Sequence, residues 1–359
     1  MRKMAYIVKI DNITPIENAD AIEVAHVGGW KVVVKKGEYS VDDLAVYCEI
    51  DSWIPHEIFP HLSKGKEPRE YNGVKGEKLR TIKLRKQVSQ GLLLPLSVMG
   101  KSNYVRTTIP PSYWKKDGLI VEYDVGSDVS EYLNIQKYEP PIPAQLRGQI
   151  KGNFPSFIPK TDQERIQNCY KHITNPDNET IWESVVVEEK LEGSSTTIYY
   201  NNGDTGVCSR NLDLKEEGGD SFWKATKDQQ IVEKLTEYCE RTGRNLAIQG
   251  ELIGNVQGNI YKLDKNVIRA FDIYDIDEGS YLGYFERSDI LTELDILQVP
   301  VLLGFDSLLG YTIDELLSLA EDKSALNPKQ EREGVVVKSL FDPDSSFKII
   351  SNKYLMKQD

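Results

Sequence analysis

Five prolines between residues 139 and 160 constrain the fold of this chain strongly, because they separate it into two parts. Proline disfavours helix and stiffens the backbone. With 359 residues, the chain is long enough for two domains that each bury a core. We therefore expect one domain at residues 1–138, a Pro-rich linker at 139–160 and a second domain at 161–359. The prolines of this stretch are Pro140, Pro141, Pro143, Pro155 and Pro159.

The first domain is expected to be a small all-β barrel or sandwich. Its sequence consists of short strand-like runs separated by turn residues such as Gly28 and Gly29, which is the pattern of such folds. From Tyr6 to Pro55 the sequence is similar to an OB-type barrel of the tRNA-binding kind. The strands are expected at residues 5–10, 21–27, 30–36, 44–50, 80–84 and 91–96.

Residues 75–86 of this domain hold six basic side chains and a single acid, Glu77. Because alternate residues of a strand share a face, Lys83 and Arg85 are expected to lie side by side. On a chain with a formal net charge of −12, such a basic strand is where a phosphate backbone would bind. The alternative is an ordinary solvated edge strand protected by its charge. A second basic candidate consists of Trp114, Lys115 and Lys116.

Composition indicates a soluble globular protein, with 40% hydrophobic and 28% charged residues. No apolar run approaches the roughly 20 residues that cross a bilayer, and no signal-peptide stretch follows the basic N-terminus. The four cysteines are scattered without zinc-ligand spacing, which favours free thiols in a reducing compartment. We expect an intracellular protein, cytoplasmic or nuclear, without membrane attachment and without an obligate protein partner.

The second domain is expected to be α+β. Thr161 and Glu164 form a capping-box pattern that predicts a helix presenting Arg165, either to a phosphate or simply to solvent. Residues 221–240 have the pattern of one amphipathic helix, and a second capping box at Thr312 predicts another. Strands are expected at residues 196–200, 207–210, 246–250, 267–274, 334–338 and 346–350.

The run from Val185 to Lys190 predicts a strand with a lysine at its end. Glu192 lies two residues further on, on the same face as the lysine, and Gly193 allows backbone to approach a ligand closely. Such a lysine can be held over a binding site. The alternative is a solvated lysine at a strand end.

Six short elements follow one another in the second domain. They are Lys190-Leu191-Glu192-Gly193, Ser209-Arg210-Asn211, Gln249-Gly250-Glu251-Leu252, Phe271-Asp272-Ile273-Tyr274, Glu333-Gly334-Val335-Val336-Val337-Lys338 and Phe347-Lys348-Ile349-Ile350. Their order resembles that of the covalent nucleotidyltransferases, the polynucleotide ligases and capping enzymes. DNA ligases and capping enzymes place an OB domain after the last element, but here only residues 349–359 follow Lys348. With its barrel at the N-terminus, the whole chain resembles the ATP-dependent RNA ligases that carry an N-terminal OB-fold domain.

This resemblance implies an α+β fold, in which an OB-type β-barrel precedes a nucleotidyltransferase (adenylyltransferase) domain built on antiparallel sheets. It also implies an ATP-dependent RNA ligase that forms a lysyl-AMP intermediate, adenylylates an RNA 5′-phosphate and joins it to a 3′-OH RNA end. Its partners would be RNA ends or a nicked duplex, and its cofactors ATP as substrate with Mg²⁺ or Mn²⁺. Two alternatives remain, a GTP-dependent RNA guanylyltransferase and a non-catalytic RNA-binding module.

The resemblance further implies roles for single residues, with Lys190 as the nucleophile. The nucleotide would be bound by Glu189, Lys190, Arg210, Glu251, Phe271, Lys338 and Lys348. The metal would be held by Glu192, Glu251 and Glu333, whose hard oxygens suit Mg²⁺ or Mn²⁺. Phosphate or RNA contacts are expected from Arg165, Lys83 and Arg85. Two alternatives stay open, because Phe271 is equally typical of a core aromatic residue and Glu333 of a loop acid.

An amine attacks a phosphate only when it is deprotonated, and free lysine has a pKa near 10.4. The pKa of Lys190 must therefore fall during the reaction, and neighbouring cations such as Lys338, Lys348 or a bound metal ion would lower it.

Two positions depart from the pattern of the resembled family. Glu192 stands where many ligases have aspartate, and Ile350 stands where a second lysine is common. Lys353 is the nearest replacement for that lysine.

Overall fold

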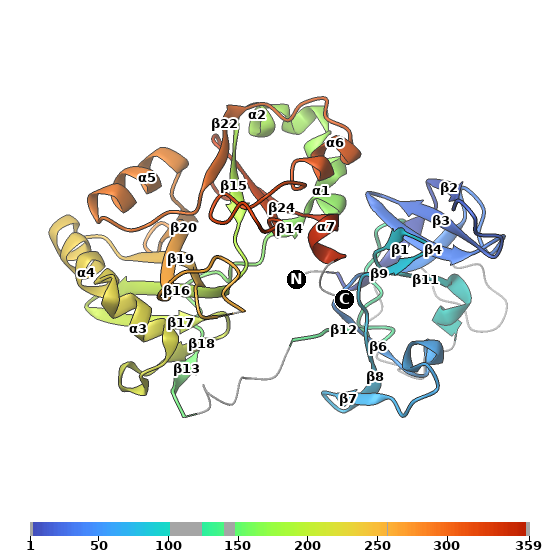
Figure 1. The fold of residues 1–359 in the computed structure, drawn as a ribbon, viewed down its shortest axis with the longest axis horizontal. Coiled ribbons are helices and arrows are strands. Elements are labelled where there is room, and N and C mark those ends of the chain that lie inside the picture. Colours follow the sequence, from blue (N-terminus) through green and yellow to red (C-terminus); the bar gives the residue numbers. More distant parts are fainter. Residues whose placement is uncertain (1–2, 101–123, 140–147, 257, 357–359) are drawn as a thin grey trace. The chain divides into compact units, whose positions relative to one another are not determined.

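The computed structural model of the chain describes residues 3–100, 124–139, 148–256 and 258–356. Its backbone divides into two units, Met1–Pro140 and Pro141–Asp359, and each is described by itself (Figure 1). The basic candidate formed by Trp114, Lys115 and Lys116 lies outside the described residues.

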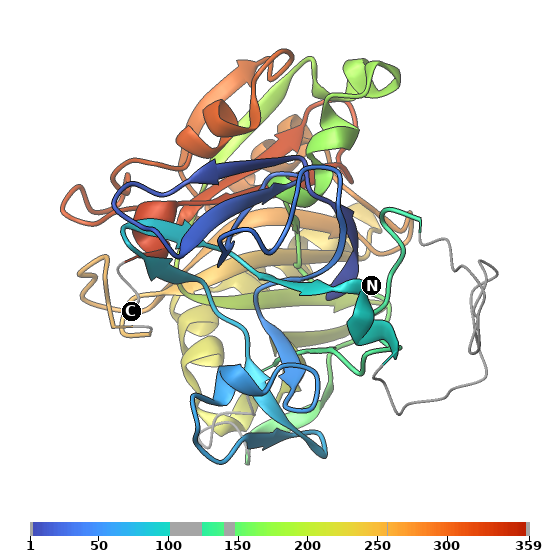
Figure 2. The ribbon, with the colours of Figure 1, turned by 90° about the vertical axis from the view of Figure 1, so that its right-hand side faces the viewer.

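Short antiparallel strands in four small sheets build the described part of the first unit. They twist strongly around one another (Figure 2), and two apolar clusters, one with Ile7 and Val46 and the other with Trp30 and Tyr47, form its core. The sheets are β1 (Ala5–Lys9), β5 (Leu44–Cys48) and β11 (Leu92–Pro95); β2 (Asn12–Pro15), β3 (Ile22–Val27) and β4 (Trp30–Lys35); β12 (Gln136–Lys137), β6 (Ser52–Pro55), β8 (Val74–Lys78) and β7 (Arg69–Tyr71); and β9 (Ile82–Leu84) with β10 (Gln87–Ser89). Each of the six predicted strands of this unit is therefore present.

The basic segment differs from its predicted form. Arg85 and Lys86 have φ values of +49° and +69° and form the two-residue turn between β9 and β10, where both central residues require positive φ. The prediction that Arg85 lies beside Lys83 on one strand is therefore wrong, because the strand ends at Leu84. Lys83 and Arg85 are both exposed, one on the strand and the other at the hairpin tip.

The larger sheet of the second unit has seven antiparallel strands (Figure 1). In order they are β13 (Ile150–Asn153), β18 (Leu212–Leu214), β17 (Asp204–Ser209), β16 (Ser194–Asn201), β19 (Leu246–Ile253), β20 (Val267–Asp275) and β21 (Ser280–Tyr281). Three helices pack against this sheet through one shared apolar cluster. They are α3 (Ser221–Asp228), α4 (Ile231–Thr242) and α5 (Tyr284–Glu293).

Two predictions are corrected in this region. The single helix expected at residues 221–240 is two helices, because Gln230 adopts a left-handed backbone with φ of +56° that no continuous helix accommodates. Part of the expected linker is also not a plain connection, since residues 150–153 form the edge strand β13 and pair with β18. This stretch lies between the prolines of the linker, so its backbone N–H groups are free to pair.

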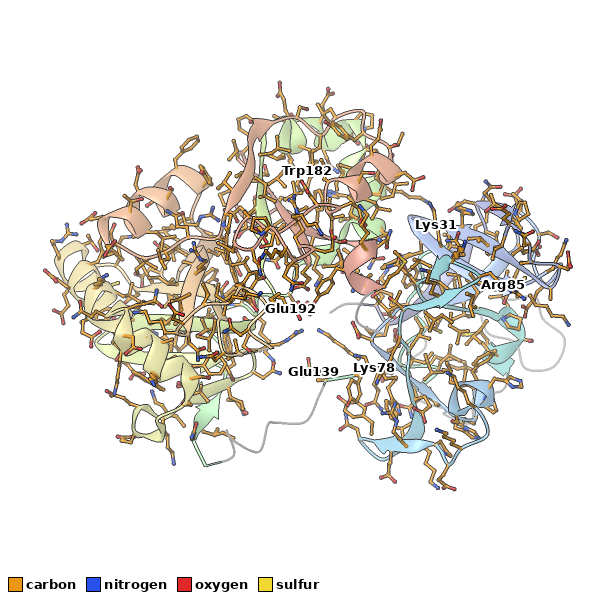
Figure 3. All side chains as sticks on the ribbon, viewed as in Figure 1. Lys31, Lys78, Arg85, Glu139, Trp182 and Glu192 are labelled. Atoms are coloured by element: carbon orange, nitrogen blue, oxygen red, sulfur yellow. The ribbon has the colours of Figure 1, made fainter. Side chains whose placement is uncertain are left out.

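The second sheet of this unit has five strands and includes the strand that ends at Lys190. In order they are β14 (Glu164–Arg165), β24 (Ser346–Ile350), β23 (Gly334–Ser339), β15 (Val185–Lys190) and β22 (Val301–Asp306). All neighbours are antiparallel except β14 and β24. Its apolar core includes Trp182 (Figure 3). The helices of this region are α1 (Ile166–Ile173), α2 (Glu179–Trp182), α6 (Ile313–Ser318) and α7 (Asn352–Leu355).

One of the two predicted capping boxes exists. Thr312 and Glu315 exchange both hydrogen bonds of the box at the start of α6. The box expected at Thr161 does not form, because Glu164 belongs to β14 and its carboxylate accepts from Asn168 Nδ2 at 2.8 Å instead. The helix α1 accordingly begins at Ile166, without a side-chain cap.

Short 3₁₀ turns complete the described chain, at Pro60–Ser63, Leu96–Gly100, Pro176–Asn178 and Glu216–Gly218. All four cysteines are free thiols, as predicted. Among the described residues, no helix has the length and apolar character needed to span a membrane.

Candidate active site

Lys190 is the last residue of β15, and strand register decides its first partner. It pairs across the sheet with Gly334, so Glu333, the residue before this glycine, reaches the lysine. The Lys190 Nζ and Glu333 Oε1 atoms are 2.6 Å apart. A glycine is required at 334 because a Cβ atom there would lie 2.1 Å from the Ile349 carbonyl oxygen. Gly334 therefore allows the strands to pair, and Glu333 before it contacts Lys190.

A second acid, Glu251, approaches from the seven-stranded sheet. It lies on β19 opposite Ser195 of β16. The connecting turn comes so close that a Cβ atom on Gly193 would lie 2.4 Å from the Leu252 carbonyl oxygen. Burial raises the pKa of Glu251 to about 8; Lys190 partly offsets this and Glu333 adds to it. The two sheets thus supply one acid each to the neighbourhood of Lys190.

These acids change the proton equilibrium of Lys190 itself. Burial alone would lower its pKa, but the negative charges of Glu333 and Glu251 raise the pKa above its ordinary value. The direction is opposite to the one that nucleophilic attack requires. This shift favours the ammonium form of Lys190, and its activation requires that the negative charge beside it, chiefly that of Glu333, be neutralised.

Glu192, the third predicted metal ligand, is half-buried in the short loop between β15 and β16 (Figure 3). Its backbone N–H donates to Tyr261 Oη at 2.7 Å, and burial raises the pKa of its carboxyl, while a hydrogen bond with Tyr354 opposes that change. Among the described residues, no three His, Cys, Asp or Glu side chains form a ready-made metal site. The three predicted acids therefore surround Lys190 without closing into a cage.

Phe271 is positioned by an irregularity of β20. Gln249 of β19 pairs with Asp272 and Gly250 pairs with Ala270, so Phe271 is the extra residue of a β-bulge. Bulges redirect a side chain and are common beside active sites. The Phe271 ring is partly buried at the edge of a small apolar cluster, and Lys338 Nζ lies 5.6 Å from its centre. The ring is thus neither wholly in the core nor wholly exposed.

Glu189 is buried, and its Oε2 atom accepts a hydrogen bond from the Ala325 backbone N–H at 2.8 Å. Burial raises the pKa of this carboxyl, and hydrogen bonds partly offset the effect. The Glu189 side chain is therefore held in place on β15, next to Lys190 in the chain.

Lys338 lies in a buried charged network that was not anticipated from the sequence. Its Nζ atom lies 2.6 Å from Asp272 Oδ1 and 3.1 Å from Glu188 Oε2. Arg287 pairs with the same two acids, and both cations donate to the Phe271 carbonyl oxygen. The alternation of residues along β15 could have indicated this network. Lys338 lies opposite Val186, and Val186 shares its strand face with Glu188.

Lys348 and Arg210 meet at an acid that was also missed. Asp162 lies 3.3 Å from Lys348 Nζ and 3.5 Å from Arg210 Nη2. Arg165 was expected on a helix, facing either a phosphate or solvent. It is instead 8% exposed on the strand β14, where its backbone lies opposite Lys348 in the parallel pairing of β14 with β24. Its positive charge partly opposes the rise in the pKa of Lys190 that Glu333 and Glu251 cause.

Lys353 does not join these residues. Its Nζ atom lies 3.7 Å from Glu321 Oε2 and its side chain is 57% exposed, while Ile350 is buried. The neighbouring Tyr354 of α7 is the residue that reaches Glu192. Lys83 and Arg85 belong to the first unit, and their contact with RNA remains a prediction.

Comparisons with known proteins agree with these features. The family described as RNA ligase matches residues 183–350, which include all six elements, and an OB-fold domain matches residues 4–96. No match was found among curated proteins.

Solved structures provide whole-chain relatives. The chain is similar to the Naegleria gruberi RNA ligase with PPi, at 41% identity and a TM-score of 0.83 over 99% of both chains. A variant of that ligase with AMP and Mn gives the same values. Another variant, with ATP and Mn, is 40% identical, again with a TM-score of 0.83 over 99% of both chains. The chain therefore belongs to the ATP-dependent RNA ligases that carry an N-terminal OB-fold domain.

Proposed function

We propose that this protein seals RNA through three phosphoryl transfers that begin at Lys190. The Nζ atom attacks the α-phosphorus of ATP, the bond to the β-phosphate oxygen breaks, and pyrophosphate leaves. An oxygen of an RNA 5′-phosphate then attacks the same phosphorus and releases the amine, which gives a 5′-5′ pyrophosphate. A 3′-hydroxyl finally attacks the RNA phosphate, and AMP leaves. The single observation that carries this proposal is the Lys190 amine held by Glu333 at 2.6 Å among further acids and cations.

The chemistry of the acids fits Mg²⁺ or Mn²⁺. Glu192, Glu251 and Glu333 offer hard oxygens, and mutual repulsion contributes to the raised pKa of Glu251 and of Glu192. Because they form no cage, they would hold a metal partly through water and substrate phosphate, as Mg²⁺ prefers. When bound, the divalent cation neutralises the acids and the developing charge on the phosphate.

The remaining roles follow from placement. With Glu333 and Glu251 neutralised, the burial of Lys190 favours the neutral amine. Lys348 and Arg210 would stabilise phosphate charge, and the bulged Phe271 would stack on adenine, with Glu189 at the base edge. Lys338 is engaged by Asp272 and Glu188, so its contact with the α-phosphate requires that it leave part of this network.

The test is transfer of label from ATP labelled on the α-phosphate, with Mg²⁺ or Mn²⁺, followed by denaturing electrophoresis. We expect a labelled band with the native chain, none with Lys190→Ala, and an undiminished band with Lys353→Ala, an exposed lysine of the same unit. A band with GTP alone would instead indicate a capping enzyme. A folded protein that takes label from neither nucleotide would be a binding module.

A second stage tests the substrate. The labelled enzyme is mixed with RNA carrying a 5′-phosphate nick, and transfer of AMP to RNA and sealing to the 3′-OH strand are followed. We infer that exposed Lys83 and Arg85 and the buried Arg165 assist RNA or phosphate binding. Charge-removing variants of the first two would then weaken RNA binding and leave lysyl-AMP formation unchanged.

We also infer that the protein acts inside the cell, in the cytoplasm or nucleus. Four free thiols, three of them buried, support a reducing compartment. Fractionation of cells that express the tagged chain tests this assignment, and recovery from the secreted fraction would contradict it.

A further inference from the structure

The segment from Lys160 to Asp162 joins the two sheets of the second unit directly beside the proposed phosphate site. Lys160 Nζ donates to Asn211 Oδ1 at 2.9 Å, and the hydroxyls of Thr161 and Ser195 are 2.8 Å apart. Both of these partners belong to the region of the seven-stranded sheet. Glu164, two residues later, begins the strand that pairs with β24 of the other sheet.

Asp162 is the charged residue of this segment, and it bridges one cation from each sheet. Arg210 follows β17 of the seven-stranded sheet, while Lys348 lies within β24 of the five-stranded sheet. The carboxylate uses one oxygen for each, Oδ2 toward Arg210 and Oδ1 toward Lys348. A substrate phosphate would also place two of its oxygens between Arg210 and Lys348.

These ion pairs have the features of a replaceable contact. Their separations, 3.5 Å and 3.3 Å, exceed the roughly 2.7–2.9 Å of a strong charge-assisted hydrogen bond. The side chains of Arg210, Asp162 and Lys348 are 55%, 30% and 13% exposed, so water screens the attraction of Asp162 for Arg210 more than that for Lys348. A phosphate carries more charge and more acceptor oxygens than a carboxylate, so it competes well for the same donors.

We propose that Asp162 is an internal competitor of the substrate phosphate. It holds Arg210 and Lys348 across the two sheets while no nucleotide is bound, and it gives them up when a phosphate group arrives. The proposal rests on the function proposed above, and it adds a residue that sets how tightly phosphate-bearing ligands are held. A site that keeps its own anion has lower affinity for phosphates and releases pyrophosphate and AMP more readily.

The test compares ligand affinities of the full-length chain with and without the Asp162 charge. Both proteins carry Lys190→Ala, so that no covalent adduct forms, and binding of pyrophosphate, ATP and adenosine is measured by calorimetry. We expect Asp162→Asn to lower the Kd for pyrophosphate and for ATP roughly three- to fivefold, the range of an exposed ion pair. The Kd for adenosine, which has no phosphate, should not change.

Three further variants make the result specific. Asp162→Glu keeps the competing charge and should bind like the parent, whereas Asp162→Ala should behave like Asp162→Asn. Asp228→Asn removes an exposed acid on α3 and controls for net charge. Thermal unfolding of every variant reports whether the fold is preserved.

Unchanged or weaker binding of pyrophosphate to both Asp162→Asn and Asp162→Ala would overturn the proposal, because Asp162 would then position the cations rather than compete for them. An equal gain for adenosine would overturn it as well. Failure of the proposed function would give a different result: no label would be transferred from ATP to the protein that retains Lys190.

Discussion

At the scale of single residues, the charge around Lys190 is set by neighbours that belong to other strands. Glu333 and Glu251 raise the pKa of the amine although its burial alone would lower it. The resting site therefore favours the protonated lysine. Its reactivity is controlled by the neutralisation of two acids rather than by the lysine's own surroundings in the sequence.

Phe271 provides a residue-scale prediction about nucleotide binding. Phe271→Leu keeps apolar volume at the bulge but removes the aromatic face, so we expect ATP binding to weaken by roughly 1–3 kcal/mol of lost stacking, which raises the Kd about five- to 150-fold. Phe271→Tyr should bind ATP nearly as well as the native chain. Calorimetry in the Lys190→Ala background measures both, and equal affinity for Leu and Phe would show that the ring serves only the apolar cluster.

A second residue-scale prediction concerns the adjacent residues Lys353 and Tyr354. Tyr354 hydrogen-bonds Glu192, whereas Lys353 faces Glu321. Tyr354→Phe should therefore slow lysyl-AMP formation by about fivefold, the equivalent of one hydrogen bond of about 1 kcal/mol. Lys353→Ala should leave the rate unchanged. The reverse result would mean that Lys353 replaces the second lysine absent at position 350.

At the scale of elements, the turn after β20 depends on one buried carboxylate. Asp275 accepts hydrogen bonds from Arg244 Nη2 at 2.7 Å and from the N–H groups of Asp277 and Glu278. Burial alone would raise the pKa of Asp275, but these hydrogen bonds lower it below its ordinary value of 3.8. Its ionised form is therefore part of the folded state.

The sign of the pH effect follows from this lowered pKa. The contribution of Asp275 to stability is present above its ordinary pKa and is lost as the pH falls through its folded value. Asp275→Asn should lower the free energy of unfolding at pH 7 by about 1–3 kcal/mol. The difference from the native chain should shrink below about pH 4. Urea unfolding at several pH values measures this, and a difference independent of pH would contradict it.

At the scale of the molecule, buried charges connect the two sheets of the second unit. Glu188 on β15 pairs with Arg287 of α5 and with Lys338 of β23, and Asp272 of β20 pairs with both cations. Removing one member leaves buried charges uncompensated. Because Arg287 and Lys338 also donate hydrogen bonds to the Phe271 carbonyl oxygen, loss of a member of this network should also disturb the nucleotide site.

Glu188→Gln tests this connection. We expect the free energy of unfolding to fall by about 3–5 kcal/mol, as for other broken buried ion pairs. Glu183→Gln, an exposed acid at the end of α2, should change it by less than about 0.5 kcal/mol. Chemical denaturation measures both variants, and a loss as small as that of the control would show that the network contributes little.

The division into two units gives a prediction for the whole chain. Each unit has its own apolar clusters, so fragments 1–140 and 141–359 should each fold and unfold cooperatively. Near-ultraviolet circular dichroism and calorimetry of the separate fragments measure this. A fragment without a cooperative transition would show that it requires the other for folding.

Much of the secondary structure and the family of this protein could be predicted from local patterns in its sequence. The strand that ends at Lys190, the capping box at Thr312, the N-terminal strands and the order of the six elements all depend on residues that are close in the chain. Alternation, caps and turn residues act over a few positions, so the family and its fold could be predicted. The same local rules failed where a competing local structure formed, as at Gln230 and Arg85.

Only the tertiary structure decided which distant charges meet. Lys190 and Glu333 are 143 residues apart in the chain, and Glu188 and Arg287 are 99 apart. The bridge that Asp162 makes between Lys348 and Arg210 likewise depends on how the two sheets pack. Strand register and the bulge at Phe271 determine these contacts, and a shift of one residue would turn each side chain to the opposite face. The sequence by itself therefore determined the chemistry available to the site, and the packing of two sheets decided which groups act together.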